Sequence, residues 1–158
     1  MTYENHRVIA IAAATGRIGC VLLIGSNVKQ CKMLRRSGLK ADLAERQTKI
    51  WIKNMKPEAL VTENVGLRSR KSETTIRNIH AIIDEGRKAN LIVYPVHRKK
   101  RFKNKFAEAV ALADMHPEMK SFLPTRNRKC FDTEPRKLIF FEALSMAHTA
   151  YDWDIQVN

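Results

Sequence analysis

Cysteine, glycine and proline are scarce in this 158-residue sequence. The three cysteines, Cys20, Cys31 and Cys130, are scattered and lack metal-ligand spacing, which predicts reduced thiols rather than a disulfide framework. With only 6 glycines and 5 prolines, and no internal repeat, no segment is typical of a flexible linker. Length and composition together predict one domain over residues 1–158.

Long apolar runs are absent as well. No stretch approaches the roughly 18 consecutive apolar residues that predict a membrane-spanning helix. Residues 1–7 are polar and lack the pattern of a signal peptide. We therefore expect no membrane association, and the unpaired cysteines favour the cytoplasm or another reducing compartment.

Acidic residues are outnumbered, because 29 Lys and Arg stand against 16 Asp and Glu and give a formal charge of +13. Hydrophobic residues make up 44% of the chain, which is enough for a packed core and too many for a disordered basic tail. This charge on a compact domain favours a polyanionic partner, because basic side chains that neutralise phosphates release counterions. A solvated surface with excess lysine is the alternative.

The positive charge is clustered, which favours nucleic acid as the partner. Residues 97–105 (HRKKRFKNK) hold six Lys or Arg in nine positions, and shorter clusters lie at 68–71 and 126–129. A nuclear-localisation signal would explain the first cluster but leaves the other two unexplained. The basic residues that we expect to contact nucleic acid are Arg68, Arg70, Lys71, Arg98, Lys99, Lys100, Arg101, Lys103, Arg126, Arg128 and Lys129.

Hydrophobic periodicity predicts three strands joined by tight turns, followed by a helix, a strand, a helix, a strand and two helices. This order favours an α/β fold, with a mixed five-stranded sheet of three antiparallel and two parallel strands flanked by helices. Asp42 and Glu45 are typical of a capping box, and Gly86 of a helix stop. The expected strands cover residues 8–14, 18–24, 28–34, 59–63 and 90–96, and the expected helices 42–55, 72–85, 104–115 and 133–151.

Two acidic residues stand out from their surroundings. Glu63 ends an apolar strand (ALVTE), and open α/β sheets bind ligands at the carboxyl ends of their strands. Glu142 lies inside a helix that is apolar nearly all round, where a carboxylate is costly unless it is paired or binds a cation. Each acid also has a plainer explanation. Glu63 could be a solvated acid at the end of a strand. Glu142 could lie on a narrow exposed stripe with Ser145 and Thr149, or form a salt bridge to a basic side chain.

The clusters at 68–71 and 97–105 follow the expected fourth and fifth strands, so both should open at the edge of the sheet where Glu63 lies. A phosphate backbone held there would lie over the acids, and divalent cations can bridge carboxylate and phosphate. Two cations about 4 Å apart stabilise both the attacking water and the leaving oxygen in phosphodiester hydrolysis. A metal-dependent nuclease with Glu63 and Glu142 as metal ligands would account for this pattern, beside the alternatives given above for the two acids.

Three segments resemble RuvC-like Holliday junction resolvases, members of the ribonuclease H-like superfamily. Residues 8–19 (VIAIAAATGRIG) are similar to the first hairpin of that family, 59–65 (ALVTENV) to its second acidic strand, and 141–147 (FEALSMA) to its C-terminal helix. The resemblance implies a ribonuclease H-like fold and a cytoplasmic or nucleoid-associated homodimer. Such a dimer binds four-way DNA junctions and cuts two strands symmetrically using Mg²⁺, for which Mn²⁺ can substitute. It also implies that Lys105, with Lys99 or Lys100, lies near the scissile phosphate, where a lysine stabilises developing charge.

The chain departs from the family pattern at two positions. Ala12 stands where the family has its first catalytic Asp, and Ile139 stands where it has an acid one turn before Glu142. Because alanine cannot ligate a cation, we expect the chain as written to be inactive or severely impaired. Either Ala12 is an engineered Asp→Ala change, or the protein is a natural non-cleaving relative.

The leading hypothesis is a structure-selective endonuclease of DNA recombination and repair that resolves four-way junctions by two-metal hydrolysis. One alternative is a nucleic-acid-binding module of the same fold that has lost catalysis, which Ala12 and Ile139 favour. Another is a YqgF-like nuclease that acts on RNA precursors, since residues 17–19 (RIG) are similar to that group.

Overall fold

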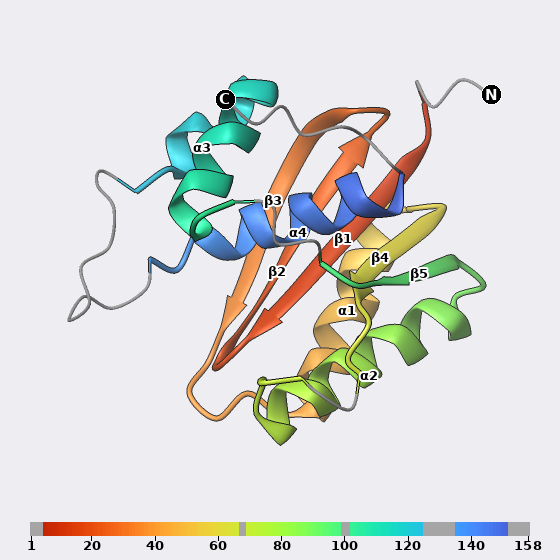
Figure 1. The fold of residues 1–158 in the computed structure, drawn as a ribbon. Helices are drawn as coiled ribbons and strands as arrows, with labels where there is room; N and C mark the ends of the chain where they lie inside the picture. The colour runs from red at the N-terminus through yellow and green to blue at the C-terminus, as the bar shows by residue number, and fades with distance from the viewer. Residues whose placement is uncertain (1–4, 67–68, 99–101, 125–134, 152–158) are drawn as a thin grey trace.

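The computed structural model describes residues 5–66, 69–98, 102–124 and 135–151 (Figure 1). The chain forms one mixed sheet with helices on both faces (Figure 1). The strands follow one another in the sheet in the order β3-β2-β1-β4-β5, so that β1 is central. The first three pair antiparallel, and β4 pairs parallel with both β1 and β5. The strands are β1 (Arg7–Ala14), β2 (Arg17–Ile24), β3 (Asn27–Arg35), β4 (Ala59–Glu63) and β5 (Ile92–Val96).

The helices divide between the two faces of the sheet. α1 (Ala41–Met55) and α2 (Glu73–Lys88) pack together on one face, and α4 (Leu138–Ala150) lies across the other face with α3 (Lys105–Met115) beside it (Figure 1). A short 3₁₀ helix, η1 (Pro117–Phe122), follows α3. The predicted sheet and order of elements are confirmed, including two parallel strands that follow an antiparallel meander.

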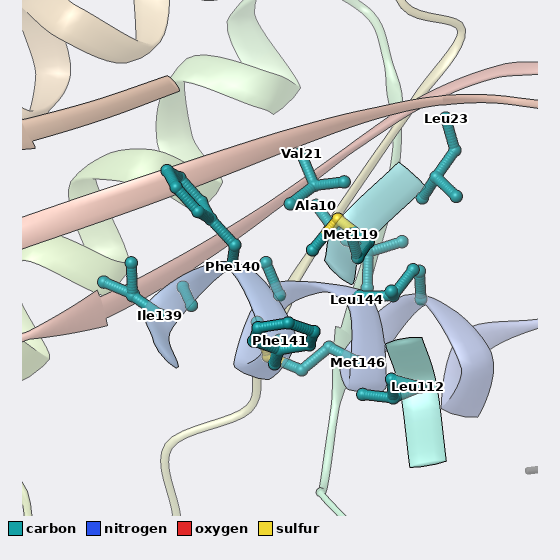
Figure 2. Packing of buried hydrophobic residues seen from close by; sticks show 14 of the residues in the cluster. Ala10, Val21, Leu23, Leu112, Met119, Ile139, Phe140, Phe141, Leu144 and Met146 are labelled. Carbon is teal, nitrogen blue, oxygen red and sulfur yellow. The ribbon is translucent and has the colours of Figure 1, made fainter. Parts of the chain in front are cut away.

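Alternation along β1 sends its side chains into two separate cores. Ile9 and Ile11 pack toward α1 and α2, whereas Val8, Ala10 and Ala12 pack toward α4. Ten residues of the core between the sheet and α4 are labelled in Figure 2, among them Phe140, Phe141 and Leu144 of α4. This helix has 11 buried residues out of 13, because it is covered by the sheet on one side and by α3 on another.

Three predicted helix boundaries were wrong. The last helix, α4, begins at Leu138, because residues 136–137 form a turn and not the start of the helix. α1 begins after Lys40 without a side-chain cap, so Asp42 and Glu45 form no capping box. Gly86 does not stop α2, which continues to Lys88. A Cβ at Gly86 would lie 2.9 Å from Cγ2 of Val93, so close packing of the helix on β5 accounts for the glycine.

A second glycine marks a close approach between α4 and the sheet. Gly19 on β2 is the cross-strand partner of Ala12, and Ile139 packs directly over it. A Cβ built on Gly19 would lie 2.6 Å from Cγ2 of Ile139, closer than two carbon atoms can approach. The side chain at 139 is 1% exposed and holds α4 against this part of the hairpin.

Replacing Gly19 by Ala is expected to lower the free energy of unfolding by about 1–3 kcal/mol, because the added methyl overpacks a site that α4 already fills. Urea denaturation measures this cost. In an Ile139→Ala background the same replacement should cost much less, since the atoms that it meets are gone. Equal costs in the two backgrounds would contradict this close packing.

Two buried histidines meet between α4 and the residue that joins α3 to η1. Nε2 of His116 lies 2.8 Å from Nε2 of His148, and the side chains are 5% and 2% exposed. Only one of the two facing nitrogens can carry a hydrogen in such a pair. Burial lowers the pKa of His116 from its ordinary value of 6.5, despite the Glu118 carboxylate 3.7 Å from its Nδ1.

This depressed pKa predicts that stability falls in mild acid. Below pH 6.5 the unfolded chain binds a proton that folded His116 binds more weakly, so the free energy of unfolding should decrease as the pH falls. Urea denaturation at pH 7.5 and 5.5 measures the slope. A His116→Gln variant should flatten it, whereas replacing the exposed His80 of α2 by Gln should not. Stability that rises toward pH 5.5 would contradict this interpretation.

The cysteines fit the prediction of reduced thiols as far as the structure describes them. Cys20 and Cys31 are unpaired, and Cys130 lies outside the described residues. Burial raises the pKa of Cys31 to about 12, so its thiol is a poor nucleophile at neutral pH. Among the described residues, no helix is both long enough and apolar enough to span a membrane.

Candidate active site

Glu63 and Glu142 line the same cavity, which has a volume of about 610 Å³. The first comes from the end of β4 and the second from the middle of α4. The acids therefore converge although they lie 79 positions apart in the sequence. Basic side chains line the same cavity, namely Arg70, Lys71, Arg98 and Lys105.

The register of the sheet sets the direction of Glu63. Val61, two residues earlier on β4, packs in the core beneath α4, and alternation along the strand gives Glu63 the same face. Thr62 points the other way, and its Oγ1 donates a hydrogen bond to the carbonyl oxygen of Ile11 at 2.8 Å. This bond ties the carboxyl end of β4 to β1.

Glu142 is buried but paired. Its Oε1 lies 2.8 Å from Nζ of Lys105 and 3.6 Å from Nη1 of Arg98, while its side chain is 7% exposed. Burial raises the pKa of this carboxyl, but the charges of Lys105, Arg98 and Lys71 outweigh burial and hold it below its ordinary value of 4.5. Glu142 is therefore an anion at neutral pH. The predicted alternative of a salt bridge applies, and the exposed stripe with Ser145 was wrong, since Ser145 is 2% exposed.

Lys71 reaches the other carboxylate. Its Nζ lies 3.8 Å from Oε2 of Glu63 and donates a hydrogen bond to the carbonyl oxygen of Ala13 at 3.0 Å. Lys71 precedes Ser72, whose side chain caps α2 by accepting a hydrogen bond from the Thr75 N–H. Oε2 of Glu63 is itself buried and accepts no hydrogen bond from any described residue.

The sequence analysis did not single out Glu108, which lies next to the candidate site. Glu108 on α3 is 6% exposed, and its Oε1 accepts a hydrogen bond from Nη2 of Arg98 at 2.6 Å. Burial raises the pKa of Glu108, although Arg98 and the Ser145 hydroxyl, 3.1 Å from its Oε2, oppose the shift. Glu108 thus positions Arg98 beside Glu142. Glu108 could have been found by the feature that singled out Glu142, because it too is a lone acid within an apolar helical run.

Ala12 and Ile139 do not line the cavity. Ala12 is 3% exposed and packs in the apolar cluster beneath α4 together with Ile139. The parallel register ends with the pair of Ala10 and Val61, and beyond it Lys71 contacts both the Ala13 carbonyl and Glu63, so Ala12 lies near the end of β4 that carries Glu63. Position 12 therefore adjoins the candidate site, but packing with Ile139 makes its surroundings apolar.

The basic clusters meet at this edge of the sheet as far as they are described. Lys103 lines a neighbouring cavity of about 220 Å³ with Arg98 and Lys105. A third cavity, of about 340 Å³, is lined in part by Arg17, Arg70, Lys71 and Lys105, so the cavities share walls. The remaining basic candidates lie outside the described residues and are Arg68, Lys99, Lys100, Arg101, Arg126, Arg128 and Lys129.

The donor set of the cavity fits one divalent cation and not two. Magnesium is commonly held by one or two carboxylates, with water and substrate phosphate completing its shell. Glu63 and Glu142 supply such a pair, and Oε2 of Glu63, which accepts no hydrogen bond from a described residue, is a suitable ligand atom. Within the described ranges, no group of three or more Asp, Glu, His or Cys side chains is arranged to hold a metal. Among the described residues, the two-ion site that the resemblance implies therefore lacks ligands.

Comparison with known proteins identifies the fold. No family model matches the sequence, and no curated protein matches it. Among solved structures, Thermus thermophilus RuvC in complex with a Holliday junction substrate matches with a TM-score of 0.65 at 15% identity, covering 93% of this chain and 94% of that chain. The fowlpox virus Holliday junction resolvase matches with a TM-score of 0.59 at 11% identity, over 92% of this chain and 98% of its own.

The yeast mitochondrial Holliday junction resolvase Ydc2 also matches, with a TM-score of 0.55 at 12% identity over 97% of this chain and 83% of its own. The chain therefore has the ribonuclease H-like fold, in the form found in RuvC and other Holliday junction resolvases. The expected fold class is confirmed.

Proposed function

We propose that this protein binds branched DNA, four-way junctions above all, at the cavity that holds Glu63 and Glu142. The observation that carries the proposal is the convergence of two acids from β4 and α4 within a ring of basic side chains. Phosphates of a junction backbone would lie against Lys71, Arg98 and Lys105, with further contacts to Arg70 and Lys103. Solved structures of the same fold include complexes of RuvC and of the fowlpox resolvase with Holliday junction DNA.

The chain as written binds without cutting in this proposal. Two-metal hydrolysis requires more carboxylate ligands than Glu63 and Glu142 supply, and Ala12 offers none. We expect nuclease activity only when an acid replaces Ala12. In such a variant Mg²⁺ or Mn²⁺ would be the ion, and Lys105 would stabilise charge on the transferring phosphoryl group. The second candidate is a natural nucleic-acid-binding module of this fold that does not cut, which is supported by the apolar packing of Ile139 where the resemblance implies an acid.

A competition experiment tests the proposed binding. A labelled four-way junction is bound to the protein, and unlabelled junction, duplex DNA of equal length and structured RNA are added in turn. The proposal predicts that the junction competes best and that no product forms with Mg²⁺ present. Equal competition by the duplex would contradict selectivity for branched DNA, and stronger competition by the RNA would favour the YqgF-like alternative.

The proposal includes a homodimer, because symmetric cutting of a junction requires two active sites. Light scattering on the free protein and on its junction complex measures the stoichiometry. Two protomers on each junction are expected, and a single bound protomer would contradict this part of the proposal.

A further inference from the structure

Lys71 occupies an unusual place for a basic residue at the edge of a sheet. Its ammonium lies between the carbonyl oxygen of Ala13, at 3.0 Å, and Oε2 of Glu63, at 3.8 Å. Its charge also helps to lower the pKa of Glu142 on α4. The Lys71 side chain is 27% exposed and that of Glu63 is 20% exposed, so both are partly shielded from water. One ammonium thus acts on both acids of the site.

These surroundings are those of a bound cation. A main-chain carbonyl and carboxylates are hard oxygen donors, the kind that hold Mg²⁺ and Ca²⁺ in proteins. The carbonyl belongs to Ala13, next to Ala12 at the end of β1, and the carboxylate belongs to the neighbouring strand. The ammonium donates a hydrogen bond to the carbonyl oxygen and lies at ion-pair distance from the carboxylate, and it needs no metal to do so.

Each acid of the site, and the neighbouring Glu108, already has a cation close to it. The carboxylates of Glu63, Glu108 and Glu142 are matched by Lys71, Lys105 and Arg98, and each acid has one of these cations within 4 Å. A divalent ion added to this set would have to displace the Lys71 ammonium or lie beside it. The repulsion between the divalent ion and the ammonium is large at short range in a partly buried site.

We propose that the Lys71 ammonium takes the place of a divalent cation at the Glu63–Glu142 pair, so that the protein holds a DNA phosphate at this site without a metal ion. This inference rests on the proposed function, since it assigns the means by which the same cavity binds DNA. A phosphate oxygen meets Lys71 and Lys105 directly, and the lysines separate it from the two carboxylates. Junction binding is then independent of Mg²⁺ in the chain as written.

Removing the lysine should create a requirement for the metal. In a Lys71→Met variant, Glu63 repels the phosphate, and junction affinity measured by fluorescence anisotropy in EDTA should fall by roughly tenfold or more. Adding Mg²⁺ should restore most of that loss, because an ion can now bridge carboxylate and phosphate. Lys103→Met removes the same charge from the neighbouring cavity, where Lys103 is exposed, and the affinity that this variant loses should not be restored by Mg²⁺.

A double variant isolates the acid. Replacing Glu63 by Gln together with Lys71→Met removes the ligand for the ion, so Mg²⁺ should no longer restore affinity. A readout without DNA uses the paramagnetic resonance of Mn²⁺ mixed with the protein alone. The Lys71→Met variant should bind Mn²⁺ more tightly than the unaltered chain, and the double variant should not.

The outcomes separate this inference from the proposed function. If the unaltered chain binds no junction, the proposed function fails. If it binds junctions only when Mg²⁺ is present, the function stands and the role of Lys71 is overturned. Equal responses to Mg²⁺ by Lys71→Met and Lys103→Met would also overturn it, as would equal Mn²⁺ binding by the unaltered chain and Lys71→Met.

Discussion

An Ala12→Asp variant is expected to nick four-way junctions in the presence of Mg²⁺, whereas the chain as written yields no product. The substitution places a third carboxylate beside Glu63, on the face of the sheet that looks toward α4. A completed ligand set can hold ions against the scissile phosphate, and we expect nicking at roughly 10²–10³ times the background of the assay or more. Gel analysis of a labelled junction measures the rate.

The matched control is Ala12→Asn. Asparagine has nearly the same shape as Asp and enters the same apolar surroundings, but its amide lacks the charge needed to hold the ion. Circular dichroism of both variants checks that they fold, since a polar group at a position 3% exposed is costly. A well-folded Ala12→Asp variant that cuts neither branched nor duplex DNA would count heavily against the proposal that an acid at position 12 makes this site a nuclease.

Lys71 should set the metal requirement of this variant. Because its ammonium pairs with Glu63, it competes with any ion for that carboxylate. Adding Lys71→Met to Ala12→Asp should therefore lower the Mg²⁺ concentration that gives half-maximal nicking. An unchanged requirement would show that the lysine and the ion do not share a place.

The second large effect concerns salt. Junction affinity is expected to fall by about 10³-fold or more between roughly 50 and 200 mM monovalent salt, as for proteins that contact six or more phosphates. The cavities at this edge of the sheet are lined by Arg17, Arg70, Lys71, Arg98, Lys103 and Lys105, and the whole chain carries a charge of +13.

Anisotropy titrations at several salt concentrations give the slope of log affinity against log salt. Replacing Lys103 by Met should reduce the slope by about one, because one phosphate contact is lost. Replacing the exposed Lys49 of α1, on the opposite face of the sheet, should leave the slope unchanged. Equal effects of the two substitutions would mean that DNA is not bound at this edge.

The sequence was sufficient for the fold because its strands and helices differ plainly in hydrophobic period. The apolar runs on both sides of Gly16 predicted the hairpin, and Glu63 at the end of its strand predicted one acid of the cavity. Helix ends were predicted less well. Gly86 matched the pattern of a stop, but its real constraint is contact with Val93, a tertiary feature that local sequence does not encode.

The candidate site was only partly predictable for the same reason. The burial of Glu142 in an apolar helix predicted a paired or cation-binding acid, and the structure shows Lys105 and Arg98 beside it. The contacts of Lys71 with Glu63 and with the Ala13 carbonyl depend on how the segment before α2 crosses the end of β1. The position of Glu108 beside Arg98 depends on the packing of α3 against α4.

The most direct test of the account is the junction affinity of a Glu63→Gln variant in EDTA. If a DNA phosphate lies over the acids, removing the charge of Glu63 should tighten binding by about three- to tenfold, because one repulsive charge next to Lys71 is lost. Glu45→Gln on α1, on the other face of the sheet, should leave the affinity unchanged. Affinities that are the same for both variants would show that the phosphate does not lie at this pair of carboxylates.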